Sequence, residues 1–225
     1  MRNTKGKIEE MKKIKPASRL RFPEDEKRLP WLPLLLEAYS IIDKGVALAI
    51  REEEERRRAK PACRKGCSTC CSTHRDIPVY PLEMVGIYWF TIEKLQAPLR
   101  TTLRDQLMLH SKERPCPFLI DGACSVHPLR PVACRQFNVF DRPCDEGEDP
   151  YYTRRADVLS PIRNYADRAF TVMLPFYGIT DEKMKAEVVK NGLIHAHARV
   201  LQELNWKELA RRMDDFDSLP TPSSP

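Results

Sequence analysis

The clearest periodic pattern along the chain is an apolar stripe that recurs every three or four residues from Leu35 onward. All of its members fall on one face of a helix: Leu35, Ala38, Tyr39, Ile42, Val46, Ala49 and Ile50. The stripe runs into the charged stretch 51–60, where pairs such as Glu53 and Arg57 stand four residues apart and suit a solvated helix face. Pro61 is expected to end this helix.

A second helix is expected to begin at Pro81, because proline suits the first helical position, and Glu83 would then favour the helix dipole. Its buried stripe is predicted to comprise Met84, Val85, Tyr88 and Ile92. Further helical patterns occur at 101–112, 157–174, 181–190, 193–204 and 206–213. The stretches 62–80 and 115–150 have no regular period, are expected to be loops, and hold all eight cysteines.

These patterns predict a mainly α fold, a small helical domain in which two irregular cysteine-rich loops converge on a common centre. Residues 1–30 alternate basic and acidic residues with little apolar content, and are expected to be a basic flexible arm. Residues 31–217 would form a single helical domain with its cysteine-bearing core at 60–144. Residues 218–225 are rich in serine and proline and are expected to be a disordered tail.

The composition agrees with one globular unit, since 42% of the 225 residues are hydrophobic and 31% are charged. The net charge of +6 is concentrated at one end of the chain. Residues 1–30 hold ten Lys and Arg against five Asp and Glu, a net of +5, which leaves +1 for residues 31–225. A nearly neutral body has no large field to hold a phosphate backbone, so nucleic acid is not an expected partner.

No targeting or membrane-spanning segment is recognisable. The first 30 residues lack the apolar run of a signal peptide, and the apolar stretch 31–50 is interrupted by Glu37, Asp43 and Lys44. A cytoplasmic location is therefore expected. Reducing conditions there favour thiolate metal ligands over four disulfides, which the even number of cysteines would also allow.

The cysteines follow two ordered patterns, Cys63-x3-Cys67-x2-Cys70-Cys71 and Cys116-x7-Cys124-x9-Cys134-x9-Cys144. Thiolates are soft ligands, so a site rich in them suits zinc or an iron–sulfur cluster rather than Mg²⁺ or Ca²⁺. Adjacent side chains tend to point apart, so Cys70 and Cys71 are expected to serve different metals, in two sites or in one polynuclear cluster. A second Cys-x2-Cys pair is missing, which disfavours a single zinc ribbon or finger.

Two other motifs share part of this spacing. Cys63-x3-Cys67-x2-Cys70 matches the cluster motif of radical S-adenosylmethionine enzymes, but those enzymes resemble α/β barrels and usually have an aromatic where Thr69 stands. The strand–helix alternation of a barrel is not visible in this chain. Cys67 and Cys70 alone resemble a thioredoxin-like redox pair, but no βαβ pattern surrounds them.

A longer signature emerges when the two loops are taken together. The first loop contributes Cys63-Arg-Lys-Gly66-Cys67-Ser-Thr-Cys70-Cys71. The second contributes Cys116-Pro117-Phe118-Leu119, Gly122-Ala-Cys124-Ser-Val126 and Arg130-Pro131-Val-Ala-Cys134-Arg135-Gln-Phe137. Over about residues 60–140 these segments resemble the YkgJ-type cysteine-cluster family, a CxxCxxCC domain that is described as zinc- or iron-chelating.

The resemblance implies that seven cysteines are metal ligands: Cys63, Cys67, Cys70, Cys71, Cys116, Cys124 and Cys134. Cys144 lies beyond the core signature and is predicted as an eighth ligand. His127 stands where the family usually has an aromatic residue, so it is either a ligand or a replacement ring. His74 is a further candidate nitrogen ligand, although an exposed loop histidine is the favoured interpretation. Flagellin lysine N-methylases carry a similar cysteine pattern, which makes S-adenosylmethionine an additional candidate cofactor.

Arg130 and Arg135 lie beside these cysteines and are the candidate cofactor-binding residues. A guanidinium could offset the negative charge of several thiolates or bind an anionic substrate. Equally, the two arginines could be hydrogen-bonding clamps across an irregular loop.

The favoured function is a cysteine-rich metal-binding protein that carries an iron–sulfur or other iron centre for redox or group-transfer chemistry. Iron is favoured because eight thiolates with an adjacent pair suit a cluster. The alternative is a zinc-chelating structural or interaction module without catalysis. Metal ions are the expected partners, beside a protein or small molecule that the sequence does not identify, and enzymatic activity stays open.

Overall fold

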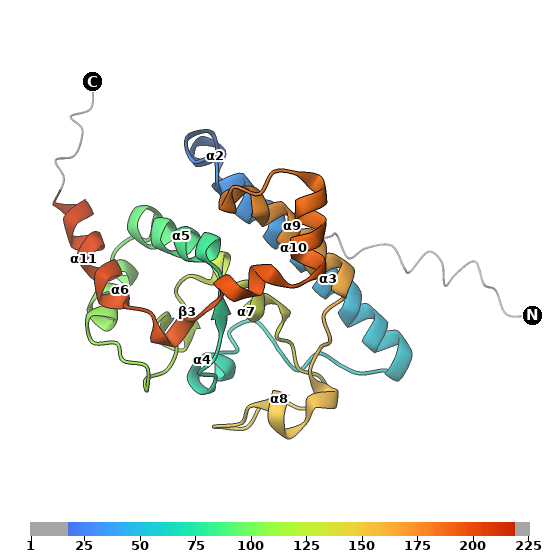
Figure 1. The fold of residues 1–225 in the computed structure, drawn as a ribbon. Coiled ribbons are helices and arrows are strands. Elements are labelled where there is room, and N and C mark those ends of the chain that lie inside the picture. Colours follow the sequence, from blue (N-terminus) through green and yellow to red (C-terminus); the bar gives the residue numbers. More distant parts are fainter. Residues whose placement is uncertain (1–17, 219–225) are drawn as a thin grey trace, which may run out of the picture.

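The computed structural model describes residues 18–218, and helices form most of this part of the chain (Figure 1). The mainly α prediction is therefore confirmed. The α-helices are α2 (Pro23–Arg28), α3 (Leu32–Arg57), α4 (Thr69–Thr73), α5 (Pro81–Trp89), α6 (Leu99–Met108), α7 (Val132–Gln136), α8 (Pro150–Thr153), α9 (Arg163–Met173), α10 (Glu182–Lys190) and α11 (Trp206–Asp217). None of the helices within 18–218 combines the length and apolarity that a membrane crossing requires.

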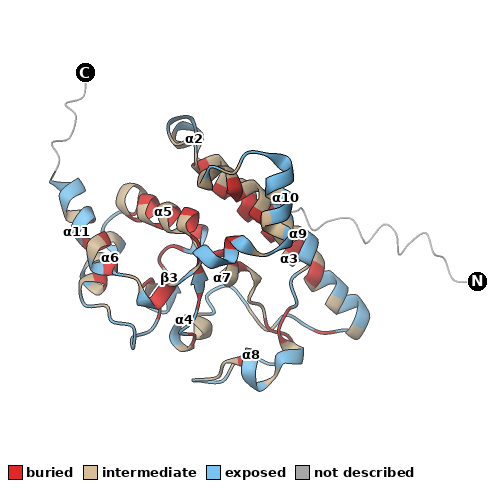
Figure 2. Ribbon diagram, viewed as in Figure 1, coloured by how far each residue is buried: buried red, intermediate tan, exposed pale blue. Residues whose placement is uncertain are grey.

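Helix α3 is the longest element and packs along α9 (Figure 1). Its predicted apolar stripe is buried over the first three turns, where Leu35, Tyr39 and Ile42 are at most 2% exposed. The last turns leave the body, so the charged stretch is exposed to solvent (Figure 2). The helix ends at Arg57, and Arg58 takes a left-handed conformation just ahead of Pro61.

Helix α5 begins at Pro81 as predicted and continues into a π-helical turn, Phe90–Lys94. The predicted buried stripe is wrong, because Met84, Val85, Tyr88 and Ile92 are only partly buried. The buried positions are Leu82, Glu83, Gly86, Ile87 and Trp89. Gly86 explains the difference: a Cβ at this position would collide with the Leu35 side chain, so the glycine lets α5 approach α3 closely.

The strands within residues 18–218 form two short antiparallel pairs. Strand β1 (Pro78–Val79) pairs with β4 (Arg199–Val200), and β2 (Leu119–Ile120) forms a hairpin with β3 (Ala123–Cys124). The helix predicted over 193–204 is wrong, because 3₁₀ turns at Leu193–His197 and Leu201–Glu203 flank β4 there. The backbone at 199–201 bonds to β1 instead of to its own helix, with Leu201 N donating to Ile77 O at 2.8 Å.

Other predicted boundaries shift by a few residues. The helix predicted at 157–174 begins at Arg163, after Pro161, which cannot donate within a helix. At the C-terminal end, α11 packs on α6, where Leu107 and Leu209 are fully buried and Arg104 Nε donates to Asp214 Oδ1 at 2.8 Å.

The predicted flexible arm, residues 1–30, includes residues that the structure packs against the helical body. Residues 1–17 and 219–225 lie outside the described residues, so the arm and tail predictions are untested there. From residue 18 the chain is ordered: Phe22 packs edge-on against Trp89 at 4.9 Å, and Arg19 pairs with Glu26 and Glu37. Helix α2 therefore belongs to the helical body.

A substitution at Gly45 of α3 tests the close packing of α3 against α9. A Cβ at Gly45 would lie 2.6 Å from Tyr165 Cβ, an atom that cannot move without moving α9 itself. We expect Gly45→Ala to lower the free energy of unfolding by about 1–3 kcal/mol, although alanine is the better helix former. Urea denaturation measures the change. Lys44→Ala, at the exposed neighbouring position, is the control and should stay within about 0.5 kcal/mol of the wild type; an unchanged midpoint for Gly45→Ala would contradict this packing.

Candidate metal centre

The first cysteine loop is built around a short helix. Residues 62–80 were predicted to be a loop, but Cys70 and Cys71 lie in α4. Gly66 has a φ of 86°, which permits the tight turn ahead of Cys67, whose N–H donates to Arg64 O at 3.0 Å. The turn and the helix together bring all four cysteines of this loop into one short segment.

The second set of cysteines comes from four separate pieces of backbone. Cys116 precedes β2, Cys124 lies in β3 opposite Leu119, and Cys134 is the central residue of α7. Cys144 lies in the irregular segment that leads to α8. The stretch 115–150 is thus a chain of short elements rather than one open loop.

Backbone hydrogen bonds hold the two loops together. Cys116 N donates to Cys71 O at 2.8 Å, which joins the start of the second loop to α4. Near the other end, Ala62 N donates to Val139 O at 2.8 Å, and Val139 N donates to Cys63 Sγ at 3.3 Å. The predicted convergence of the loops is therefore present in the backbone as well as in the side chains.

Five thiols interact with one another and form what we call the five-thiol group: Cys70, Cys71, Cys116, Cys124 and Cys134. Interaction with the Cys116 thiol is the largest cause that raises the pKa of Cys71, to about 12. Interaction with the Cys71 thiol, followed by burial, raises the pKa of Cys70 far above its usual value. Burial, with the charges of Cys70, Cys71 and Cys124 added, raises the pKa of Cys134.

The remaining cysteines form a three-thiol group: Cys63, Cys67 and Cys144. Burial is the main cause that raises the pKa of Cys144 to about 11, and the charges of Cys63 and Cys67 add to it. Burial also raises the pKa of Cys63, where Cys67 and Cys70 contribute in the same direction. Cys70 therefore links the two groups.

The raised pKa values describe thiols that cannot ionise together without a cation among them. A bound metal ion supplies that cation, and its binding releases the thiol protons. All eight cysteines are free in this structure, so each sulfur is available to donate to a metal. Within 18–218, no three His, Cys, Asp or Glu side chains are already placed at the spacing that holds an ion, so binding would draw the thiols closer together.

The two candidate histidines occupy different environments. His74 was interpreted as an exposed loop residue, but it is only 9% exposed and packs edge-on against Phe137 at 4.4 Å. Its Nε2 is buried, lies 3.4 Å from Asp149 Oδ1, and makes no hydrogen bond there. His127 is exposed, with Nδ1 at 3.3 Å from Arg130 Nη1. His74 thus packs between the loops, whereas His127 lies at the surface.

Arg135 has the contacts of a clamp. It is 6% exposed, and its Nη1 donates to both carboxylate oxygens of Asp43 at 2.8 and 3.1 Å. Its Nε and Nη2 donate to the carbonyl oxygens of Arg130 and Pro128. The guanidinium also lies 3.9 Å from the Tyr39 ring centroid. These contacts commit Arg135 to joining α7 and the preceding turn to α3.

Arg130 is placed differently, because its Nη1 donates to His127 O at 3.0 Å and no carboxylate within the described chain pairs with it. Burial, and then the nearby Arg135 cation, lower the pKa of Arg130, while the charges of Cys134 and Cys124 act in the opposite direction. Of the two arginines, Arg130 is therefore the one whose charge acts on the thiols.

Glu83 is a structural residue. The sequence predicted its position in the first turn of α5, but neither its burial nor its contact with α7. It caps α5, as its position after Pro81 suggested, because Oε2 accepts from Tyr80 N at 2.9 Å. Its other oxygen accepts from Val132 N at 2.6 Å, the first residue of α7. The carboxylate is fully buried and joins the beginnings of the two helices. Acidic first-turn residues are common at surfaces, so no local signal distinguishes this buried one.

Eight free thiols on two converging loops define a cysteine-rich metal-chelating protein. Residues 62–157 match the CxxCxxCC family model, whose description is "Putative zinc- or iron-chelating domain". Residues 62–157 are thus similar to this cysteine-cluster family, and the resemblance inferred from the cysteine spacing is confirmed over that range. The match extends past Cys144, and it supports metal binding in general, with zinc or iron as the metal. The chain matches no curated protein and no solved structure.

Glu83 is expected to make the stability depend on pH. Burial raises its pKa from 4.5 to about 7, against the opposing effect of the Tyr80 and Val132 amides. Between those values the folded state holds a proton that the unfolded state has released, so the stabilisation is complete below 4.5 and is lost as the pH rises through 7. The loss amounts to about 3 kcal/mol. Urea denaturation across this window should show wild-type stability falling relative to that of Glu83→Gln.

Ser40→Ala is the control for this pH series, since it alters a buried hydroxyl and no titratable group. It should keep the wild-type pH dependence. Parallel pH profiles for the wild type and Glu83→Gln would show that the carboxyl does not titrate in this window.

Proposed function

We propose that the five-thiol group binds iron in a polynuclear centre, an iron–sulfur cluster or a related iron site, for redox or group-transfer chemistry. The observation that carries the proposal is the backbone pairing of the two cysteine loops, with Cys116 N donating to Cys71 O and Ala62 N donating to Val139 O, both at 2.8 Å. The raised pKa values of the thiols around α4, α7 and the β2–β3 hairpin agree with this gathering. A structural zinc ion takes four ligands in a tetrahedron. Five thiols with an adjacent pair exceed that number and suit a centre with more than one metal atom.

The relation between Cys70 and Cys71 supports one shared centre. Their side chains were expected to diverge toward different metals, yet the thiols interact with each other. Cys71 also interacts with Cys116, and Cys70 with Cys124 and Cys134. The adjacent pair thus fits two corners of one polynuclear site better than two separate sites.

The nearby charge and the partial burial of the thiols favour a metal centre that is shielded from bulk water. A cluster held by several thiolates carries net negative charge, and its potential is set by nearby charges, hydrogen bonds and solvent exposure. Arg130 supplies a cation beside Cys124 and Cys134. Buried apolar side chains, including Phe118, Val126 and Leu129, back the same region. An iron centre here would supply redox or Lewis-acid chemistry, with Arg130 positioned to offset thiolate charge.

The free state of all eight cysteines supports function in a reducing compartment, which agrees with the expected cytoplasmic location. The resemblance also makes S-adenosylmethionine a candidate cosubstrate for a group-transfer role. The unidentified partner would then be the molecule that accepts the methyl group.

Elemental analysis of anaerobically purified protein tests the proposal. We expect more than one iron per chain, a brown colour, and visible absorption that bleaches on reduction with dithionite. Acid-labile sulfide in proportion to the iron would identify an iron–sulfur cluster. A colourless protein that holds zinc alone after anaerobic expression with added iron would overturn the iron proposal in favour of a zinc-chelating module.

Single cysteine replacements test which thiols belong to the centre. Cys71→Ser should weaken iron retention at least as much as the ~10–100-fold that loss of an outer partner costs a metal site. Cys144→Ser should retain the visible absorption, because Cys144 belongs to the three-thiol group. Iron content after dialysis against a chelator gives the comparison.

Ser72→Ala, at the exposed residue that follows Cys71 in α4, is the matched control and should keep full iron content. Equal losses for Cys71→Ser and Cys144→Ser would refute the division into two groups.

A further inference from the structure

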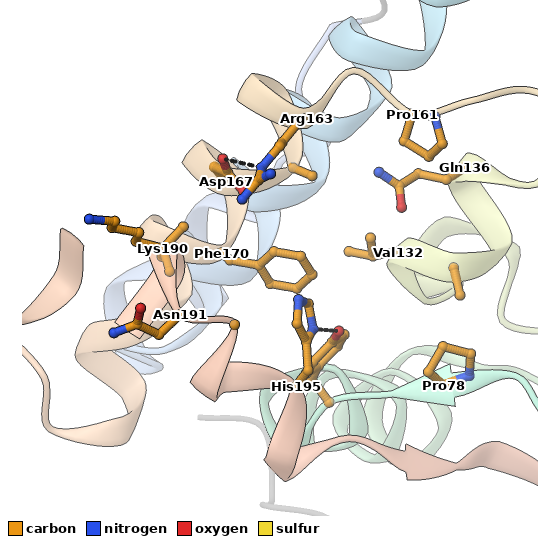
Figure 3. A pocket seen from close by; sticks show the side chains of 15 residues that line it. Pro78, Val132, Gln136, Pro161, Arg163, Asp167, Phe170, Lys190, Asn191 and His195 are labelled. Atoms are coloured by element: carbon orange, nitrogen blue, oxygen red, sulfur yellow. Dashed lines mark hydrogen bonds and ion pairs between the residues drawn. The ribbon is translucent and has the colours of Figure 1, made fainter. Parts of the chain in front are cut away.

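A cavity of about 530 Å³ lies beside the thiol region, and no step proposed above uses it (Figure 3). It is bounded by α9, by the turn that follows α10, by α7, and by the segment that joins β1 to α5. Its volume falls in the range of small-molecule sites, about 300–1,000 Å³. Val132, Ala133 and Gln136 of α7 form one wall, and the same helix carries Cys134.

The deep part of the cavity is apolar and rigid. Phe170 is 7% exposed and Val132 2% exposed, and Figure 3 shows the two side chains facing each other across the cavity. Phe170 packs edge-on against Tyr80 at 5.0 Å and against His195 at 5.1 Å. The floor thus offers a fixed aromatic surface to the apolar part of a ligand.

Polar groups surround this floor and favour an anion. Arg163 pairs with Asp167 at 3.6 Å, but their side chains are 81% and 42% exposed, so the pair is weak and the guanidinium is available. Lys190 has no carboxylate partner within ion-pair distance in residues 18–218. Two cations against one carboxylate leave a net charge of +1, which one carboxylate group would neutralise.

His195 adds an oriented hydrogen-bond donor. Tyr80 Oη lies 2.6 Å from His195 Nδ1, and burial raises the pKa of Tyr80, so the phenol keeps its proton to donate. With Tyr80 as the donor Nδ1 accepts, which leaves Nε2 as the ring nitrogen that can donate to a ligand. In Figure 3 this second nitrogen lies on the cavity side of the ring, beside Phe170.

We propose that this cavity binds a small organic monocarboxylate, whose apolar body lies against Phe170 and Val132 and whose carboxylate faces Arg163 and His195. Lys190, whose ammonium is turned outward in Figure 3, adds positive charge at the rim without contacting the ligand. The apolar floor selects the body of the ligand, and the net charge selects a single negative group. The site does not depend on which metal the thiols hold, so it goes beyond the function proposed above.

Calorimetric titration of the metal-loaded full chain with 3-phenylpropanoate tests the proposal. The uncharged 3-phenylpropanamide and the dianionic phenyl phosphate are titrated in parallel. We expect 3-phenylpropanoate to bind most tightly of the three. Arg163→Gln should weaken its binding by about tenfold, the value of one charge-assisted hydrogen bond. Lys190→Gln removes a charge at the rim and should weaken binding by a smaller factor, about two- to threefold.

Arg168→Gln and Lys183→Gln are matched controls, because each lies on the same helix as its counterpart, is exposed, and stays outside the cavity. Both should bind 3-phenylpropanoate as the wild type does. Ala166→Phe fills the cavity and should abolish binding while leaving the melting temperature and metal content close to wild type. Metal content measured on the same samples separates a failed pocket from a failed metal centre.

Absence of 3-phenylpropanoate binding to the wild type would overturn the proposal. So would equal binding of the amide, which would leave an apolar groove without anion selectivity. Tighter binding of phenyl phosphate would replace the monocarboxylate by a phosphate ester. Unchanged affinity in both Arg163→Gln and Lys190→Gln would remove the assigned cations from the site.

Discussion

The position of α7 depends on one buried carboxylate. Glu83 accepts from the amide of Tyr80, the residue that caps α5, through one oxygen and from the first amide of α7 through the other. Arg135 holds the same short helix from its other end, through Asp43 of α3 and two carbonyl groups. A helix of five residues has little stability of its own, so these fixed partners replace the cooperativity that length would supply. Cys134 therefore enters the thiol region from a rigid support.

A rigid support is needed because each thiolate raises the free-energy cost of ionising its neighbours. Gathering five sulfurs in a partly buried space raises the cost of ionising any of them, and each further thiolate raises it again. The fold therefore holds the ligands near one another by backbone bonds, such as Cys116 N to Cys71 O, that do not require ionised sulfur. A metal then has to displace protons and draw nearby thiols closer together, but it does not have to order two open loops.

Local sequence signals predicted what depends on nearby residues. The apolar stripe of α3, the start of α5 at Pro81, the span of α10 and the grouping of the cysteines all follow from short-range patterns. The errors have distant causes. The β4 segment resembled a helix because its partner, Pro78–Val79, lies far away in the chain. The buried face of α5 was misplaced because Gly86 meets Leu35, and His74 is buried by a phenylalanine of the other loop. The cavity has walls from four separate elements, so no single stretch of sequence could reveal it.

The β1–β4 pair also fixes when the first cysteine loop can be completed during synthesis. Val79 bonds in register with Arg199, Leu201 N donates to Ile77 O, and Gln202 Nε2 donates to His74 O. The segment that directly follows Cys70 and Cys71 thus lacks its backing until residues 199–202 have left the ribosome. The family match at 62–157 contains all eight cysteines but not this backing strand. All eight cysteines therefore emerge from the ribosome before the strand that backs the first loop has been made.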